Sequence, residues 1–206
     1  MEMKRFAAFG AAVLIAGTSA AATVTSPNGQ IAVTVSAEKG FTWEVMRKGK
    51  SVILPSNLGL SFRRQRPFGA FEVVKTEERA FDTVWTNRLY KKALVRDCAN
   101  ELTVHLREKD APKRLLDVVV RAYDGGVALR YGIPVQPGFE LFTLSKDCTT
   151  WRFAGDPLAW LTVYEDYRTS QERPFLHRSL RSAIGEKTLV GMPAVVELDG
   201  QMAALC

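Results

Sequence analysis

Cysteine and histidine are scarce in this chain of 206 residues. Its three cysteines, Cys98, Cys148 and Cys206, cannot all pair within one chain, and they lack the density of a disulfide-stapled domain. Both a Cys98–Cys148 bridge and free buried thiols fit the sequence, and free thiols are favoured. Because no two cysteines have C-x-x-C spacing and only His105 and His177 are available, a zinc site is not predicted.

The chain also has no segment in which charge of one sign is concentrated. Lysine and arginine total 28 against 22 acidic residues, which gives a net charge of +6. The basic clusters are short and lie apart, at 47–50, 62–66, 90–92 and 177–181. A nucleic-acid-binding protein more often concentrates its positive charge in one stripe. The sequence therefore predicts no nucleic-acid partner, and we interpret the clusters as solvated loops or faces.

Familiar catalytic motifs are missing as well. The sequence has no Ser-His-Asp order, no G-x-S-x-G elbow and no phosphate-binding glycine loop. It does have 47% hydrophobic and 24% charged residues, which is the range of ordinary globular proteins. At this length a chain can bury a sizeable core without metals or disulfides.

The first residues have the features of a secretory signal. Lys4 and Arg5 precede an apolar run from Phe6 to Ala16, and the small residues "GTSAAA" follow. A basic start, a short apolar middle and an A-x-A-like end predict a signal peptide over residues 1–21. A retained anchor is the alternative, but the run is too short to span a bilayer. We expect a periplasmic or secreted protein with no membrane span after cleavage.

Period-two alternation of apolar and polar residues dominates the rest of the chain. "GQIAVTVSA" places Ile31, Val33 and Val35 on one face, and hairpins are predicted around Gly49 and around Asp199-Gly200. Short, regularly spaced strands predict an all-β antiparallel sandwich in a single domain. Residues 155–183 are expected to be a long loop with one short helical turn. The other predicted strands are "LGLSF", "FEVV", "FDTVW", "NELTVHLRE", "LLDVVVRAY", "GVALRYGIP", "FELFTL" and "TTWRF".

The hairpin "RAYDGGVALRY" at 121–131 has a predictable register. A two-residue turn at Asp124-Gly125 sets Ala122 opposite Val127 and Arg121 opposite Ala128. A turn one residue later would place Arg121 against Arg130, and like charges facing each other across a ladder are destabilising. The first register is therefore predicted, and the hairpin is interpreted as scaffold.

Acidic residues and one histidine are the candidates for chemistry. His105 lies near Glu108 and Asp110, but a lone histidine on the polar face of a strand is usually only solvated. A second acidic group lies in "VYEDYRTSQER" and comprises Glu165, Asp166 and Glu172. Carboxylates can serve glycoside hydrolysis or calcium binding, but charges in a long loop are mostly solvent contacts.

Tryptophans are candidates for a sugar-stacking platform. Trp43 and Trp151 lie in predicted strands and are expected to be buried, whereas Trp160 is the better candidate for exposure. The remaining aromatic candidates are Trp85, Tyr164 and Tyr167.

Six segments in order resemble one family. "SPNGQIAVTV", "KGKSVILPSNLGLSF", "VRDCANELTVHLRE", "RAYDGGVALRYGIP", "DPLAW" and "LVGMPAVVELDGQMAALC" are similar to the N-terminal domain of glycoside hydrolase family 97, whose members are exported bacterial α-glucosidases and α-galactosidases. The resemblance runs from about Ser26 to the end of the chain. It implies a large galactose-mutarotase-like super-sandwich over residues 22–206 that is incomplete at its C-terminal end.

The resemblance also implies what lies outside these residues. The family's catalytic carboxylates belong to a (β/α)8 barrel, and a glutamate that binds calcium would follow just after Cys206. No catalytic, substrate-binding or metal-binding residue of this chain is therefore assigned. The implied cofactor of the longer enzyme is calcium, and its implied partners are an oligosaccharide substrate and the barrel itself. The apolar last strand, "GQMAALC", also indicates the N-terminal part of a longer enzyme.

Two other functions fit the sequence. One is a complete, non-catalytic carbohydrate-binding sandwich, which predicts exposed tryptophans and sugar affinity without metal. The other is a structural module that uses its edge strands. If the chain is instead the first part of a glycosidase, residues 22–206 alone do not hydrolyse glycosides.

The signal segment gives a direct prediction. Cleavage is expected after Ala21 or Ala22, because the small residues there satisfy the specificity of signal peptidases. N-terminal sequencing of the exported protein checks this, and an intact Met1 would contradict it.

Overall fold

The computed structural model describes residues 20–89, 91–185 and 188–206. The chain forms two compact units, one of residues up to 50 with 55–150 and one of residues 51–54 with 151–206. Strands make up most of both units, so the predicted all-β class is confirmed. The predicted signal segment lies outside the described residues except for its last two. In the described part, no helix is long and apolar enough to cross a bilayer.

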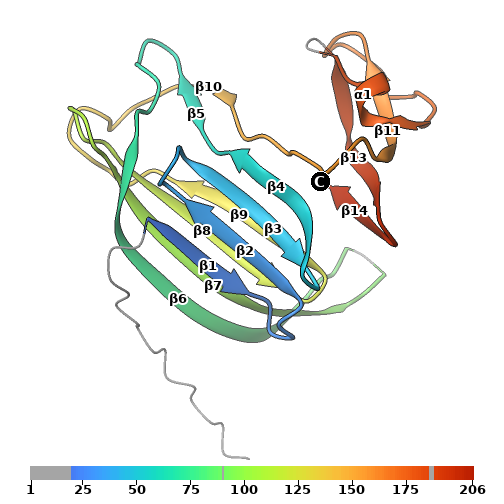
Figure 1. Cartoon of the computed structure of the whole chain (residues 1–206), viewed down its shortest axis with the longest axis horizontal. Coiled ribbons are helices and arrows are strands. Elements are labelled where there is room, and N and C mark those ends of the chain that lie inside the picture. The colour runs from blue at the N-terminus through green and yellow to red at the C-terminus, as the bar shows by residue number, and fades with distance from the viewer. Residues whose placement is uncertain (1–19, 90, 186–187) are drawn as a thin grey trace, which may run out of the picture. The chain divides into compact units, whose positions relative to one another are not determined.

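Two four-stranded antiparallel sheets lie face to face in Figure 1 and belong to the first unit, except for residues 51–54 of β4. In one sheet the spatial order is β1 (Ala21–Thr25), β2 (Ile31–Ser36), β3 (Thr42–Arg47) and β4 (Lys50–Asn57). In the other it is β6 (Phe71–Thr86), β7 (Leu94–Glu108), β8 (Leu115–Tyr123) and β9 (Gly126–Gly132). A small ladder joins β5 (Leu60–Phe62) to β10 (Leu144–Asp147). This arrangement confirms the predicted sandwich.

Alternating apolar residues fill the space between the two sheets. Successive side chains of a strand point to opposite faces, so every second residue faces the core. Burying each large apolar side chain contributes roughly 1.5–3 kcal/mol. Nine buried core residues come from both sheets: Val33, Val35, Trp43, Leu102, Val104, Leu106, Leu116, Val118 and Val120.

The predicted turns are confirmed. Ala122 pairs with Val127 and Arg121 with Ala128, which is the register that a turn at Asp124-Gly125 requires. Asp124 Oδ1 also accepts a hydrogen bond from the backbone N–H of Asn28 at 2.9 Å. The turn between β3 and β4 has Lys48 and Gly49 at φ 50° and 76°, the left-handed values that a two-residue hairpin turn favours.

Several predicted strand limits are wrong. "FEVV" and "FDTVW" belong to one continuous strand, β6, because the charged residues between them pair with β7 along an exposed face. Residues 139–143 are not strand, since Phe139 is buried among other phenylalanine rings and pairing begins only at Leu144. "TTWRF" contains only an isolated bridge between Arg152 and Leu54.

The second unit contains a four-stranded sheet, of which the sequence predicted only the hairpin around Asp199-Gly200. Its order is β12 (Leu176–Ser179), β11 (Leu158–Tyr164), β13 (Leu189–Leu198) and β14 (Gln201–Leu205). The predicted long loop at 155–183 is therefore wrong, although the expected helical turn is present as α1 (Leu180–Ala183), capped by Ser179. The predicted hairpin at Asp199-Gly200 is confirmed by the pairing of Leu198 with Gln201.

The core of this second sheet is small. Its fully buried residues are Ala159, Leu161, Ala194 and Val196, surrounded by partly buried neighbours such as Phe153. A core of this size buries little apolar surface, so each buried side chain contributes a large share of the unit's stability.

Truncation of a single leucine tests the importance of this core. Leu161→Ala removes a side chain with 0% exposure and is expected to destabilise the second unit by about 2–5 kcal/mol. Leu158→Ala, on the same strand but 44% exposed, is the matched control and should change stability by about 0.5 kcal/mol or less. Hydrogen exchange of the β11–β14 amides measures the effect. Equal exchange rates in both variants would show that this core does not determine the stability of the second unit.

Candidate functional site

A row of charged side chains crosses the outer face of the β6–β9 sheet. Arg79, Glu101 and Arg121 occupy directly paired positions on β6, β7 and β8. Arg79 Nε donates to Glu101 Oε1 at 2.6 Å, and Arg121 Nε donates to Oε2 at 2.5 Å. Glu101 is only 4% exposed although it lies on the outer face, because the two guanidinium groups cover it. We call these three residues the arginine–glutamate row.

An aromatic ring supports the row. The guanidinium carbons of Arg79 and Arg121 lie 5.8 and 4.7 Å from the centroid of the Phe81 ring. Such cation–π contacts add about 0.5–1 kcal/mol each at exposed sites. Burial works to raise the pKa of Glu101, but hydrogen bonds and charge from Arg79 and Arg121 outweigh burial, and the pKa lies below its usual value. Glu101 therefore stays ionised at neutral pH and is not a proton donor there.

A hollow of about 230 Å³ lies beside the row. It is smaller than the roughly 300–1,000 Å³ of typical ligand sites. Arg130 lies at its wall and has no ion-pair partner among the residues that the structure describes. Two of the hollow's charged groups, Glu101 and Arg121, are hydrogen-bonded to each other, and the pKa of Glu101 is lowered, so this pair is not arranged for acid–base chemistry. The lining residues of the hollow are Glu101, Val119, Arg121, Tyr123, Ala128, Leu129 and Arg130.

His105 lies farther along the same outer face and is not simply solvated. Its Nδ1 lies 2.7 Å from Asp117 Oδ1, and its Nε2 lies 3.6 Å from Glu77 Oε1. The expectation of a solvent-facing histidine is therefore wrong, since Asp117 on β8 lies directly opposite and binds the ring. The structure does not bring His105 together with Glu108, because residues three apart on a strand point to opposite faces.

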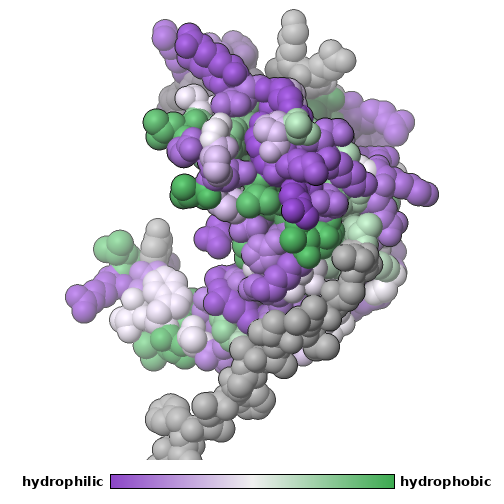
Figure 2. All heavy atoms as spheres, turned by 90° about the vertical axis from the view of Figure 1, so that its left-hand side faces the viewer, coloured by the Kyte–Doolittle hydropathy of each residue, from purple (hydrophilic) through white to green (hydrophobic). Residues whose placement is uncertain are grey.

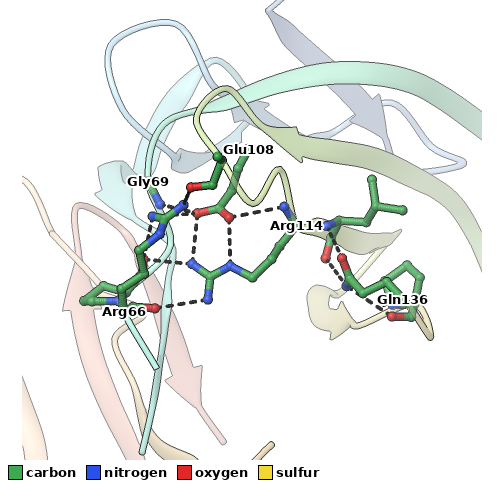
Figure 3. Close-up of polar contacts among 9 residues, drawn as sticks. Arg66, Gly69, Glu108, Arg114 and Gln136 are labelled. Atoms are coloured by element: carbon green, nitrogen blue, oxygen red, sulfur yellow. Dashed lines mark hydrogen bonds and ion pairs between the residues drawn. The ribbon is translucent and has the colours of Figure 1, made fainter. Parts of the chain in front are cut away.

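Glu108 is instead the centre of a buried polar knot, drawn in Figure 3. Its carboxylate is completely buried and accepts hydrogen bonds from Arg114 Nε at 2.7 Å and Arg114 Nη2 at 2.9 Å. The backbone N–H of Gly69 donates to Oε1 at 2.7 Å, and Arg66 Nη1 lies 3.2 Å from the same oxygen. Both carboxylate oxygens are thus fully used, which is what a buried charge requires.

The same knot ties two loops to the end of the sandwich. Arg114 donates to the backbone carbonyls of Arg66 and Pro67 at 3.0 and 2.9 Å, so one side chain fixes the segment before β6. Its guanidinium carbon also lies 4.4 Å from the centroid of the Phe68 ring. Burial works to raise the pKa of Glu108, but bonds from Arg114 and Gly69 outweigh burial and lower it. The knot is structural.

The acidic residues of the second unit do not converge. The Glu165 side chain is 91% exposed and lies 3.8 Å from Arg173, while Asp166 only accepts the backbone N–H of Arg168 at 2.6 Å. Within the described residues, no group of three or more His, Cys, Asp or Glu side chains could hold a metal ion. The three cysteines are free, with Cys206 exposed.

Two of the three tryptophans whose exposure was predicted agree with the prediction, and one does not. Trp43 is buried at 2% exposure as predicted, and its Nε1 donates to the Thr150 carbonyl at 3.2 Å. Trp151 was expected to be buried but is 44% exposed, because the segment around it forms no sheet. Trp160 is 41% exposed, as predicted. On the face drawn in Figure 2, hydrophilic residues predominate and the hydrophobic ones form small separate groups.

Comparison with known proteins identifies the family to which this fold belongs. The family described as Glycosyl-hydrolase 97 N-terminal matches residues 24–206. The chain belongs to glycoside hydrolase family 97. A variant of a family 97 enzyme from Pseudoalteromonas sp. strain K8 is similar to it at 27% identity and a TM-score of 0.77, over 85% of this chain.

Two further solved forms of the Pseudoalteromonas enzyme are similar at 26% identity: a variant in complex with panose, at a TM-score of 0.74, and the enzyme in complex with acarbose, at 0.73. A β-arabinopyranosidase shares the fold at 24% identity and a TM-score of 0.67. This chain covers 26% of each of these family 97 structures. It therefore corresponds to about a quarter of the length of the enzymes that it matches.

Sequence reasoning missed Glu101, Glu108 and Arg114 as organising residues of this family 97 domain. A signal for Glu108 exists, because it continues the alternation of the three buried apolar residues that precede it on β7. Glu101 could have been found by pairing the predicted strands, which sets it opposite Arg121. Nothing local marks Arg114, whose partners come from a distant loop.

Removal of the buried charge tests the knot. Glu108→Gln leaves Arg114 buried without its counter-charge and is expected to cost about 3–5 kcal/mol at neutral pH. Because the folded-state pKa of Glu108 is lowered, its contribution is fully present above the ordinary glutamate pKa of about 4.3 and is lost as the pH falls through the lower, folded-state value. Urea unfolding at pH 7 and at lower pH should therefore show the variant and wild type converging in acid.

The control for this experiment is an exposed pair on the same sheet. Glu72→Gln removes a carboxylate that bonds Arg107 Nε at 2.9 Å with both side chains 46% exposed, and it should cost less than about 1 kcal/mol. Two outcomes would contradict the stabilising role of the knot. One is an equal loss of unfolding free energy in Glu72→Gln and Glu108→Gln, and the other is a stability difference between Glu108→Gln and wild type that persists in acid.

Proposed function

We propose that this chain is the N-terminal β-sandwich domain of an exported, calcium-dependent α-glycosidase that hydrolyses α-glucosidic or α-galactosidic bonds. The observation that carries the proposal is the family match over residues 24–206 together with the length of the relatives, of which this chain covers 26%. Complexes of the Pseudoalteromonas enzyme with panose and acarbose support an oligosaccharide as substrate.

In this proposal the domain is a structural support for a catalytic barrel outside the 206 residues. The arginine–glutamate row and the Glu108 knot fix the sheet and its loops without a group held ready for proton transfer. Hydrolysis of this kind needs two carboxylates, one of which protonates the leaving oxygen. The barrel would supply both, and the sandwich would contribute packing surface and one wall of the substrate cleft.

Among the described residues, no three His, Cys, Asp or Glu side chains gather where a metal ion could be held. In the proposal the ion is bound by the longer enzyme, with a glutamate just beyond Cys206 as one ligand. Calcium prefers several oxygen ligands, and a bound ion of this type orients and polarises the groups around it.

A stand-alone carbohydrate-binding sandwich is the second candidate. The exposed Trp160 favours it, since an exposed indole suits a sugar ring. This candidate predicts binding without metal and no hydrolysis by any longer form of the protein.

The experiment compares the 206-residue chain with the protein encoded when the reading frame is followed beyond codon 206. The short chain should release no aryl group from aryl α-glucosides or α-galactosides, whereas the longer protein should hydrolyse one of them. A chelator should abolish that activity, and added calcium should restore it. Hydrolysis by the short chain, a stop at codon 206, or full activity in chelator would each overturn the corresponding part of the proposal.

A further inference from the structure

Trp160 belongs to a stacked pair of rings on the second unit's sheet. Trp160 on β11 lies directly opposite His177 on β12, and their ring centroids are 4.2 Å apart with an interplanar angle of 13°. Both side chains stand on the face away from the small core, because the neighbouring Ala159 and Leu161 point inward and are fully buried. The indole nevertheless remains 41% exposed.

One carboxylate fixes both rings. Glu197 Oε1 accepts the Trp160 Nε1–H at 2.8 Å and lies 2.9 Å from His177 Nε2. An ionised carboxylate only accepts hydrogen bonds, so His177 Nε2 carries the proton in this contact. In the neutral ring Nδ1 is then left as an acceptor. Neither His177 Nδ1 nor Glu197 Oε2 has a partner among the described residues, and both can receive a donor from a ligand.

The surroundings of the pair are apolar. Leu158 and Met202 are 44% and 63% exposed on the same outer face, and Val195 lies across from Trp160 on β13. The face therefore combines a flat indole of fixed orientation, flexible apolar neighbours and two acceptors at the ring edge. A stacked cross-strand pair also stabilises the sheet, but that role needs neither the exposure nor the spare acceptors.

This combination matches the chemistry of a pyranose. The C–H face of a sugar ring is apolar and stacks on an aromatic ring, whereas its hydroxyl groups donate hydrogen bonds at the edge. Sites of this kind use an aromatic surface and a few placed polar groups. Because Glu197 already holds both rings, little side-chain freedom is lost on binding.

We propose that Trp160, His177 and Glu197 form a binding site for a neutral hexopyranose oligosaccharide on the second unit. A neutral ligand fits because the available groups at the site are acceptors, one of them a carboxylate, and a sugar acid would meet repulsion. The ligand class rests on the proposed function, but the site itself requires neither hydrolysis nor calcium.

Titration calorimetry of panose into the full 206-residue chain, in the presence of a chelator, tests the site. Trp160→Ala should weaken binding by at least about tenfold, which corresponds to roughly 1.4 kcal/mol. Trp160→Phe should restore part of the affinity, because it keeps an aromatic face. His177→Ala and Glu197→Gln should each reduce affinity less than Trp160→Ala. Trp85→Ala is the matched control, since Trp85 is 50% exposed on β6 of the first unit, and it should leave binding unchanged.

The outcomes separate this site from the proposed function. Binding that Trp160→Ala leaves intact, or that Trp85→Ala weakens equally, overturns the site. Absence of panose binding by the wild-type chain overturns it as well, whereas hydrolysis by the longer protein is measured separately. Faster hydrogen exchange of the β11–β14 amides in Trp160→Ala would mean that this variant has lost structure. In that case Trp160→Phe and Glu197→Gln provide the test, and wild-type affinity for panose in both of them contradicts the site.

Discussion

The first unit depends on one buried carboxylate. Glu108 lies where β7 leaves the sandwich, and an unpaired charge at that depth would cost several kcal/mol. Arg114, which directly precedes β8, forms an ion pair with Glu108. Other N–H groups of its guanidinium donate to the backbone carbonyls of Arg66 and Pro67, before β6. The ends of three strands are thereby set by a single ion pair, and the position of Phe68 and its neighbouring rings follows from it.

Local patterns were enough to predict much of the sandwich. The alternation around Val33 and around Val104, and the Asp124-Gly125 turn, determine which faces are buried and which residues pair. Patterns failed where distant contacts decide the structure. The strand around Trp160 was missed because the irregular, polar residues 165–175 that separate it from its partner β12 made the whole segment read as a loop. Trp151 was assigned to the core because its segment alternates like a strand.

The candidate sites show the same division. Trp160 could be selected from its position, but its stacking on His177 and the shared Glu197 carboxylate arise only when three strands come together. His105 was recognised as polar and isolated, and the missing information was Asp117 on the next strand. Side chains that recognise partners through tertiary contacts leave little trace in a single sequence, whereas core positions repeat every second residue.

The arginine–glutamate row limits how this surface can evolve. Arg79 and Arg121 share one carboxylate, so loss of Glu101 leaves two like charges close together, and loss of one arginine leaves the other to neutralise Glu101 alone. Energies of residues that share a partner do not add. We therefore expect substitutions along this row to be tolerated better in combination than singly, because each one changes the partner that the next residue needs.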